Sequence, residues 1–186
     1  MRRALTCLAV AALLSGCGND RTPPPDIGVI RAPGGWRTVQ FSKAGVSLKA
    51  PVRWPSNLGQ GRRIATFSAG EAQITIWRYP RTEPLPQTRA QLHATRTSLI
   101  SQVKARDPTF ELRSSRLVRR SGLRAVELVG VGTAQGVQRS IRSLHAYGHR
   151  AEVVVDAFAP AKDFPRVDEQ TFRPVLRSTK LTAARP

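Results

Sequence analysis

Apolar and polar residues alternate with a two-residue period along much of the chain after residue 36, which is typical of half-buried β-strands. Turn signals such as Ser121-Gly122 and Gln135-Gly136 separate these stretches. Short connections of this kind join antiparallel neighbours, so consecutive strands are expected to pair as hairpins. The predicted strands cover residues 37–41, 45–49, 63–68, 72–79, 109–118, 123–133, 137–147 and 151–158.

Two stretches depart from this alternation. Between residues 88 and 106, apolar residues recur at helical spacing, which predicts one long helix that packs a single stripe on the sheet. Residues 163–178 predict a shorter helix, which Pro174 is expected to kink or shorten because proline has no backbone N–H to donate. The pattern therefore predicts an α+β fold: an antiparallel sheet of six to eight strands packed with one long and one short helix.

The N-terminal residues follow a different pattern. Arg2 and Arg3 precede the apolar run 4–14, and Ser15-Gly16 lies directly before Cys17. A positive end, a short apolar stretch and small residues before the cleavage point are typical of an export signal, and the cysteine makes it a bacterial lipoprotein signal. The run is too short to span a bilayer, which takes roughly 20 residues. We expect Cys17 to carry a lipid that holds the protein on the extracytoplasmic side of a membrane, inner or outer.

The predicted organisation has four parts. Residues 1–16 are the signal peptide, 17–35 a lipidated N-terminus with a flexible Pro/Gly tether, 36–181 a single domain, and 182–186 a disordered tail. Cys7 leaves with the signal peptide and Cys17 is used by the lipid, so the mature domain is expected to hold no disulfide. The domain is long enough to be stabilised by its hydrophobic core alone.

The chain is strongly basic, with 30 Lys and Arg against 12 Asp and Glu and a formal net charge of +18. Such a charge suits anionic lipid headgroups or wall polymers, while the export signal argues against a nucleic-acid partner. The arginine bias of a GC-rich genome is the alternative explanation. Arg119, Arg120 and Arg124 surround the Ser121-Gly122 turn and form the candidate anion-binding site, because guanidinium groups match phosphate and carboxylate. The competing interpretation is a solvated hairpin tip that protects the sheet from aggregation.

Motifs that carry chemistry are scarce. The chain contains no Gly-x-Ser-x-Gly motif, which a serine hydrolase of the α/β-hydrolase type would need. His145 and His149 flank a turn, and Glu152 or Asp156 would add a carboxylate, but two histidines without a fixed third ligand define no metal site. We therefore predict no metal, no cofactor and no catalytic residue. A deep pocket that gathers a histidine and a carboxylate would favour an enzyme instead.

A family resemblance covers residues 36–181. It rests on Gly45-Val46-Ser47-Leu48 followed by Pro51 and Trp54, a single mid-chain helix, three long strands, and a closing segment from Phe172 to Ser178. In this order the chain resembles the PsbP-like family. That resemblance implies a non-enzymatic extrinsic or accessory subunit of a membrane complex, and it carries over no catalytic or ligand residue.

Two functions follow as expectations. The first is a lipid-anchored, non-catalytic binding or accessory module of a cell-envelope or membrane complex, with an envelope protein as partner. It predicts an exposed patch of apolar or aromatic residues. The alternative is a binder of an anionic lipid or cell-wall polymer, which uses the basic patch and weakens with salt.

Overall fold

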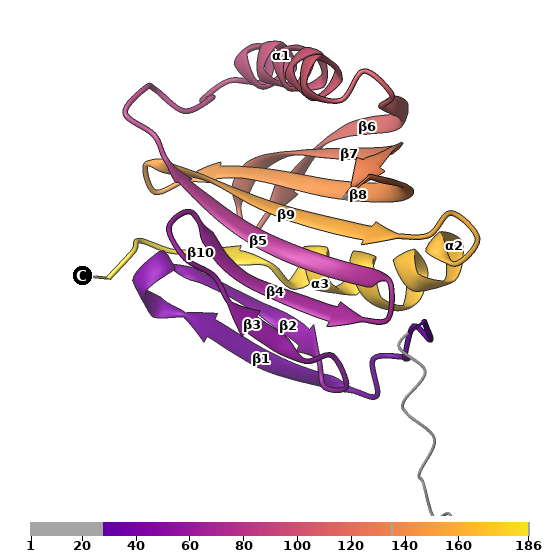
Figure 1. Cartoon of the computed structure of the whole chain (residues 1–186). Coiled ribbons are helices and arrows are strands. Elements are labelled where there is room, and N and C mark those ends of the chain that lie inside the picture. The colour runs from indigo at the N-terminus through magenta and orange to yellow at the C-terminus, as the bar shows by residue number, and fades with distance from the viewer. Residues whose placement is uncertain (1–27, 135, 186) are drawn as a thin grey trace, which may run out of the picture.

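The computed structural model describes residues 28–134 and 136–185. Within these ranges the chain forms an α+β domain with two antiparallel sheets, and helices cover both faces of the larger sheet (Figure 1). The predicted signal peptide, Cys17, the first part of the tether and Pro186 lie outside the described residues. No helix among the described residues is both long and apolar enough to cross a membrane.

The larger sheet has seven strands among the described residues, in the spatial order β3-β4-β5-β9-β8-β7-β6. Neighbouring strands are antiparallel throughout. This confirms the predicted fold class, because the alternating segments each became one strand. The strands are β3 (Ser56–Leu58), β4 (Arg63–Ala69), β5 (Ala72–Pro80), β6 (Glu111–Arg120), β7 (Leu123–Ala134), β8 (Val137–Gly148) and β9 (Ala151–Ala159).

The predicted first hairpin forms, but in a separate small sheet. This sheet has the order β1 (Trp36–Phe41), β2 (Val46–Pro51) and β10 (Lys180–Leu181). A single 3-10 turn and Gly45 connect β1 to β2, and Gly45 has a φ of 59° that favours glycine. The sequence pattern missed β3 and β10, because three and two residues are too few to show an alternation.

The long helix α1 (Arg89–Arg106) begins and ends where its helical spacing predicts. Thr88 caps it: its hydroxyl accepts from the Gln91 N–H, while the Gln91 side chain accepts from the Thr88 N–H. The helix lies over one face of the larger sheet, as the upper layer of Figure 1 shows, and its apolar stripe packs on that face. The buried residues of this layer are Leu92, Leu99, Val126, Leu128 and Tyr147.

The C-terminal helical segment covers the opposite face of the sheet. It consists of α2 (Phe164–Val167), a π-helical turn (Asp168–Phe172) and α3 (Arg173–Ser178). In the wide turn the Arg173 N–H donates to the Asp168 carbonyl, five residues earlier. Pro174, which has no N–H to donate, follows at the start of α3. The irregularity expected at Pro174 therefore takes the form of a π turn just before it.

The main core lies between this face, the C-terminal helices and the small sheet. Trp54 is 1% exposed and packs edge-on against Phe172, with ring centroids 6.3 Å apart. Its indole N–H donates to the Arg31 carbonyl, and Ile30 is buried in the same core. Residues 28–35 thus pack on the domain, which shortens the expected tether at its C-terminal end.

The end of the chain is also ordered further than expected. The Thr182 N–H donates to the Gly45 carbonyl over 2.8 Å, and the Arg185 N–H donates to the Ser42 carbonyl over 3.2 Å. Residues 182–185 therefore continue along the β1–β2 connection, in place of the disordered tail predicted from composition. Backbone pairing of this kind leaves no hydrophobic signal in the sequence.

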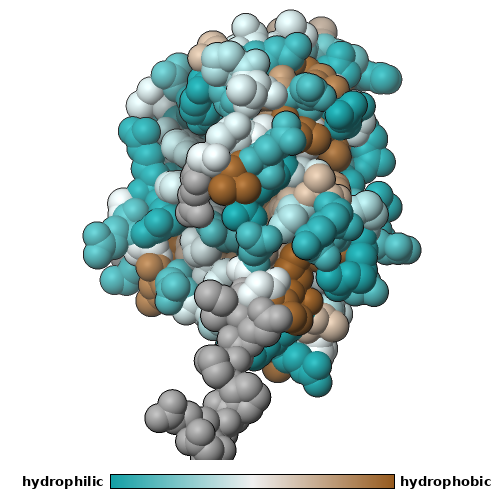
Figure 2. Space-filling model, turned by 45° about the vertical axis from the view of Figure 1, so that its right-hand side comes forward, coloured by the Kyte–Doolittle hydropathy of each residue, from teal (hydrophilic) through white to brown (hydrophobic). Residues whose placement is uncertain are grey.

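Hydrophilic side chains cover most of the face shown in Figure 2, with hydrophobic side chains in smaller groups between them. The exposed large hydrophobic residues come mostly from loops and strand ends; among those described they are Val29, Trp36, Val52, Leu58 and Val137. Trp36 begins β1 opposite Pro51, and Val52 follows directly after β2, where its N–H donates to the Gly35 carbonyl. Trp36 and Val52 thus form a small exposed apolar group, and a patch of this kind is what the accessory-module hypothesis predicts.

Candidate functional site

The face of the larger sheet that looks toward α1 carries a line of polar side chains on two central strands. On β8, Ser143, His145 and Tyr147 alternate with residues of the main core, because successive side chains of a strand point to opposite faces. On β9, Glu152 and Asp156 share the α1 side. The register places Ser143 directly opposite Asp156, and Tyr147 opposite Glu152. Antiparallel pairing therefore brings these polar groups together.

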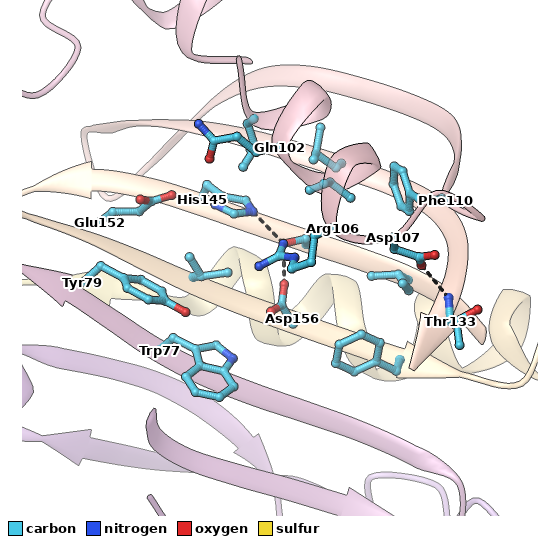
Figure 3. A pocket seen from close by; sticks show the side chains of 18 of the residues that line it. Trp77, Tyr79, Gln102, Arg106, Asp107, Phe110, Thr133, His145, Glu152 and Asp156 are labelled. Atoms are coloured by element: carbon cyan, nitrogen blue, oxygen red, sulfur yellow. Dashed lines mark hydrogen bonds and ion pairs between the residues drawn. The ribbon is translucent and has the colours of Figure 1, made fainter. Parts of the chain in front are cut away.

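Four of these side chains form one hydrogen-bonded chain, which we call the polar relay: Glu152, His145, Ser143 and Asp156. Figure 3 labels Glu152, His145 and Asp156. Glu152 Oε1 lies 2.8 Å from His145 Nδ1. The other ring nitrogen, Nε2, lies 3.0 Å from Ser143 Oγ. The Ser143 hydroxyl donates to Asp156 Oδ1 over 2.5 Å. Ser143, His145 and Glu152 are all less than 10% exposed, so the relay lies largely within the protein.

The two carboxyl groups of the relay differ in acidity. Burial alone would raise the pKa of Glu152, but hydrogen bonds and charges from His145 and from Arg81 outweigh it and lower the pKa to about 2. Arg81 donates to the second carboxylate oxygen of Glu152. Burial raises the pKa of Asp156, and the nearby His145 and Ser143 only partly oppose this. Glu152 is therefore ionised at neutral pH, while Asp156 holds a proton more readily than an ordinary aspartate.

Donor and acceptor counting limits where the protons of the relay lie. Ionised Glu152 requires a proton on His145 Nδ1. The Ser143 hydroxyl donates to Asp156 Oδ1, so its single proton is not available to His145 Nε2.

The relay forms part of the floor of a pocket of about 610 Å³ between α1 and the sheet. The C-terminal half of α1 supplies the roof, where Gln102 and Arg106 face the floor in Figure 3. Trp77 and Tyr79 of β5 and Phe158 of β9 are half-buried on the floor beside Asp156. The remaining apolar lining consists of Leu99, Val103, Phe110, Leu128, Ile141 and Val154.

Close packing beside Phe110 shapes one end of this pocket. A Cβ on Gly130 of β7 would lie 2.6 Å from two atoms of the Phe110 ring, and one on Gly132 would lie 2.8 Å from Asp107 Oδ2. Asp107 Oδ2 also accepts the Thr133 N–H over 2.7 Å, which ties the end of α1 to β7. The strand glycines therefore let the α1–β6 connection approach the sheet.

Sequence reasoning found part of this site. It placed His145 beside a turn together with His149, and named Glu152 or Asp156 as the carboxylate that would join them. The structure places His149 in the exposed β8–β9 turn with a φ of 51°, outside the pocket lining. No group of three potential metal ligands exists among the described residues. Ser143 and Trp77 were missed, although their two-residue spacing from His145 and Tyr79 on single strands was a usable signal.

The three arginines of the candidate anion site do not share one face. Arg119 and Arg124 are directly opposite each other on β6 and β7, and both line a depression on the α1 side. Arg120 faces away from this depression: its Nη2 donates to Glu127 Oε2 over 2.9 Å and its side chain is only 17% exposed. Only Arg119 and Arg124 are therefore brought together, since neighbouring residues of a strand point to opposite faces.

Comparison with known proteins identifies the fold. No protein-family model matches the chain, and no curated protein matches its sequence. Among solved structures, the cyanobacterial PsbP protein (CyanoP) from Synechocystis sp. PCC 6803 aligns with a TM-score of 0.62 and 13% identity, over 91% of this chain and 99% of that one. The domain has a PsbP-like fold.

Two further structures share this PsbP-like fold. LpqN, described as involved in cell envelope biogenesis of Mycobacterium tuberculosis, aligns with a TM-score of 0.56 and 13% identity, over 80% of this chain and 91% of that one. The protein of unknown function PA94 from Pseudomonas aeruginosa aligns with a TM-score of 0.51 and 17% identity, over 82% of this chain and 99% of that one. At these identities the likeness concerns the fold.

Proposed function

We propose that this protein is a non-catalytic binding module of the cell envelope, held on the extracytoplasmic side of a membrane through lipidated Cys17. Its recognition site is the pocket between α1 and the larger sheet, which holds a ligand or a protruding group of a partner molecule. The observation that carries the proposal is the pocket itself, since about 610 Å³ lies within the range of small-molecule sites and mixes apolar lining with a few convergent polar groups.

The electrostatics of the floor indicate what kind of group fits. The charge of Glu152 is matched by Arg81, and Arg106 and Asp107 at the end of α1 carry opposite charges. Burial raises the pKa of Asp156, which favours its uncharged form. Trp77, Tyr79 and Phe158 offer apolar ring faces beside it. The pocket therefore suits an uncharged hydrogen-bonding group attached to an apolar body.

The pocket gathers His145 with two carboxylates, an arrangement that would favour an enzyme, but the geometry of Ser143 supports binding over acyl transfer. Glu152, His145 and Ser143 follow one another as in a nucleophilic triad, but the Ser143 hydroxyl donates to Asp156 at 2.5 Å. A serine nucleophile must instead give its proton to the histidine, and its oxygen must be reachable by the substrate. Ser143 is 6% exposed, so its hydroxyl serves as a fixed part of the pocket floor.

The cell-envelope setting draws on two lines of support. The lipoprotein signal at residues 1–17 predicts export and anchoring, and one protein of the same fold, LpqN, is described as involved in cell envelope biogenesis. The PsbP-like resemblance adds an accessory role beside a larger membrane complex. A protein partner in the envelope is accordingly part of the proposal.

Site-specific photo-cross-linking in intact cells tests the proposed site. A photoreactive amino acid at Gln102, on the pocket roof, is expected to capture a defined species, whereas the same group at Gln40, exposed on β1, is not. Val103→Trp should fill the pocket and abolish capture, and Cys17→Ala should reduce it by releasing the anchor. Equal capture from Gln102 and Gln40, or capture that survives Val103→Trp, would contradict the proposal.

A separate experiment tests the non-catalytic part. A fluorophosphonate reagent labels serines that a histidine activates. We expect no labelling of the purified protein, in the wild type or in Ser143→Ala. Labelling of the wild type that Ser143→Ala removes would show an activated nucleophile and overturn this part of the proposal.

A further inference from the structure

The depression that Arg119 and Arg124 line has a third basic residue, Arg89 in the first turn of α1. The fold explains why the three meet. Leu92 of α1 packs in one apolar cluster with Leu117 and Val126, and these two are directly opposite each other on β6 and β7. Arg119 follows Leu117 by two residues and Arg124 precedes Val126 by two, so both side chains lie on this face nearer the β6–β7 turn. Arg89 lies three residues before Leu92, on the same face of α1. We call Arg89, Arg119 and Arg124 the arginine triad.

The arginine triad has no carboxylate partner within residues 28–134 and 136–185. The Nη1 of Arg119 donates to the Gly122 carbonyl over 3.1 Å, and no ion pair reaches Arg89 or Arg124 in this part of the chain. The first turn of α1 contains no acidic residue. By contrast, Arg116 and Arg120, on the same strand as Arg119, both pair with Glu127.

A bound anion would relieve the repulsion within the arginine triad. Like charges directly opposite on antiparallel strands repel each other, and Arg119 and Arg124 occupy such a position. The depression measures about 290 Å³, and its remaining lining, Leu92, Leu117 and Val118, is apolar. Three guanidinium groups around a partly apolar hollow match a compact anion that accepts several hydrogen bonds.

We propose that the arginine triad is a binding site for a phosphate group, either the headgroup phosphate of a membrane lipid or a soluble phosphate. It lies at the start of α1, whereas the pocket of the proposed function lies beneath the C-terminal half of α1. It is therefore a second site, and its occupancy does not depend on the first. Arg120 takes no part, because Glu127 holds its guanidinium on the other face of the sheet.

The test uses the purified full-length protein in zwitterionic detergent micelles. One arm titrates inorganic phosphate, and the other adds phosphatidylglycerol to the micelles, both followed by isothermal titration calorimetry at low salt. We expect saturable binding in at least one arm. Arg119→Gln and Arg124→Gln should each weaken it about tenfold, since each loses a charge-assisted contact. Binding should also weaken as salt rises.

The matched control is Arg113→Gln, which removes an equal charge from β6 at an exposed residue that pairs with Glu111. It should leave the affinity within about twofold. Saturation by phosphate assigns a soluble ligand, and saturation by phosphatidylglycerol alone assigns a headgroup. Absence of binding in both arms, or an equal loss in Arg113→Gln, overturns the proposal. Without ligand, Arg124→Gln should melt no lower than the wild type, because it removes a repulsion with Arg119.

Discussion

Arg142 of β8 and Asp168 of the π turn form a buried ion pair with two parallel hydrogen bonds. Arg142 Nε lies 2.5 Å from Asp168 Oδ1, and Nη2 lies 2.7 Å from Oδ2. The side chains are 6% and 4% exposed. The remaining guanidinium nitrogen donates to Glu127 over 2.6 Å, and Arg173 adds a second cation to Asp168. This network joins the larger sheet to the C-terminal helices on the face opposite the pocket.

Replacing Asp168 with alanine should destabilise the fold strongly. It leaves the buried Arg142 with Glu127 as its remaining carboxylate partner, and removing one partner of a buried ion pair costs about 3–5 kcal/mol. The free energy of unfolding, measured with urea, checks this. Asp163→Ala is the matched control: its partner Arg166 lies 3.4 Å away near the surface, and such pairs contribute about 0–1 kcal/mol. If the two variants lost equal free energy of unfolding, burial of the ion pair would not determine its contribution to stability.

Glu152 should make the stability depend on acid pH. Its pKa is lowered to about 2 in the folded protein, against about 4.3 in an unfolded chain. The ionised form is thus favoured on folding, and the stabilisation is complete above about pH 4.5 and lost as the pH falls toward 2. Glu152→Gln should reduce the free energy of unfolding by about 3 kcal/mol at pH 6. The gap to the wild type should close in urea titrations repeated down to pH 2.5, and a constant gap would contradict the assignment.

Asp156 should have the opposite effect to Glu152 on how stability depends on pH. Burial raises its pKa, so the folded state binds the proton more tightly than the unfolded state. Its contribution is therefore most favourable at pH values below about 3.9, its ordinary value, and declines as the pH rises through the raised value. The isosteric Asp156→Asn cannot ionise, so its stability relative to the wild type should increase between pH 4 and 7. The free energy of unfolding in urea, measured between pH 4 and 7, checks this expectation, with Asp163→Asn as the control. A relative stability that falls with pH would refute the raised pKa.

Gly130 should tolerate no side chain. A Cβ there would lie 2.6 Å from the Glu111 carbonyl oxygen as well as from the Phe110 ring. Relieving such a contact moves backbone and ring, at a typical cost of about 1–3 kcal/mol. We expect Gly130→Ala to lower the free energy of unfolding by this amount, whereas Thr38→Ala on the exposed edge of β1 changes it by less than about 0.5 kcal/mol. An unchanged stability in Gly130→Ala would show that the α1–β6 connection adapts freely.

The sequence determined the local structure well. The alternation of residues 123–133 and 137–147 and the turn glycines between strands predicted the hairpins, because side-chain direction along a strand depends on neighbouring residues alone. The helix at 89–106 followed from its apolar spacing in the same way. These local periods also sufficed for the α+β class, whereas the PsbP-like resemblance rested on the order of the motifs from Gly45 to Ser178.

Tertiary structure decided what lies between these elements. The alternation on β8 does not say which face turns toward α1, and only the pairing of β8 with β9 places Ser143 opposite Asp156. The pairing of β6 with β7 likewise places Arg119 opposite Arg124 and brings Arg120 to Glu127. A site built from residues on different strands depends on the register between the strands and on the packing of a helix distant in the sequence. Both are set by the free energy of the complete fold, which local sequence patterns do not show.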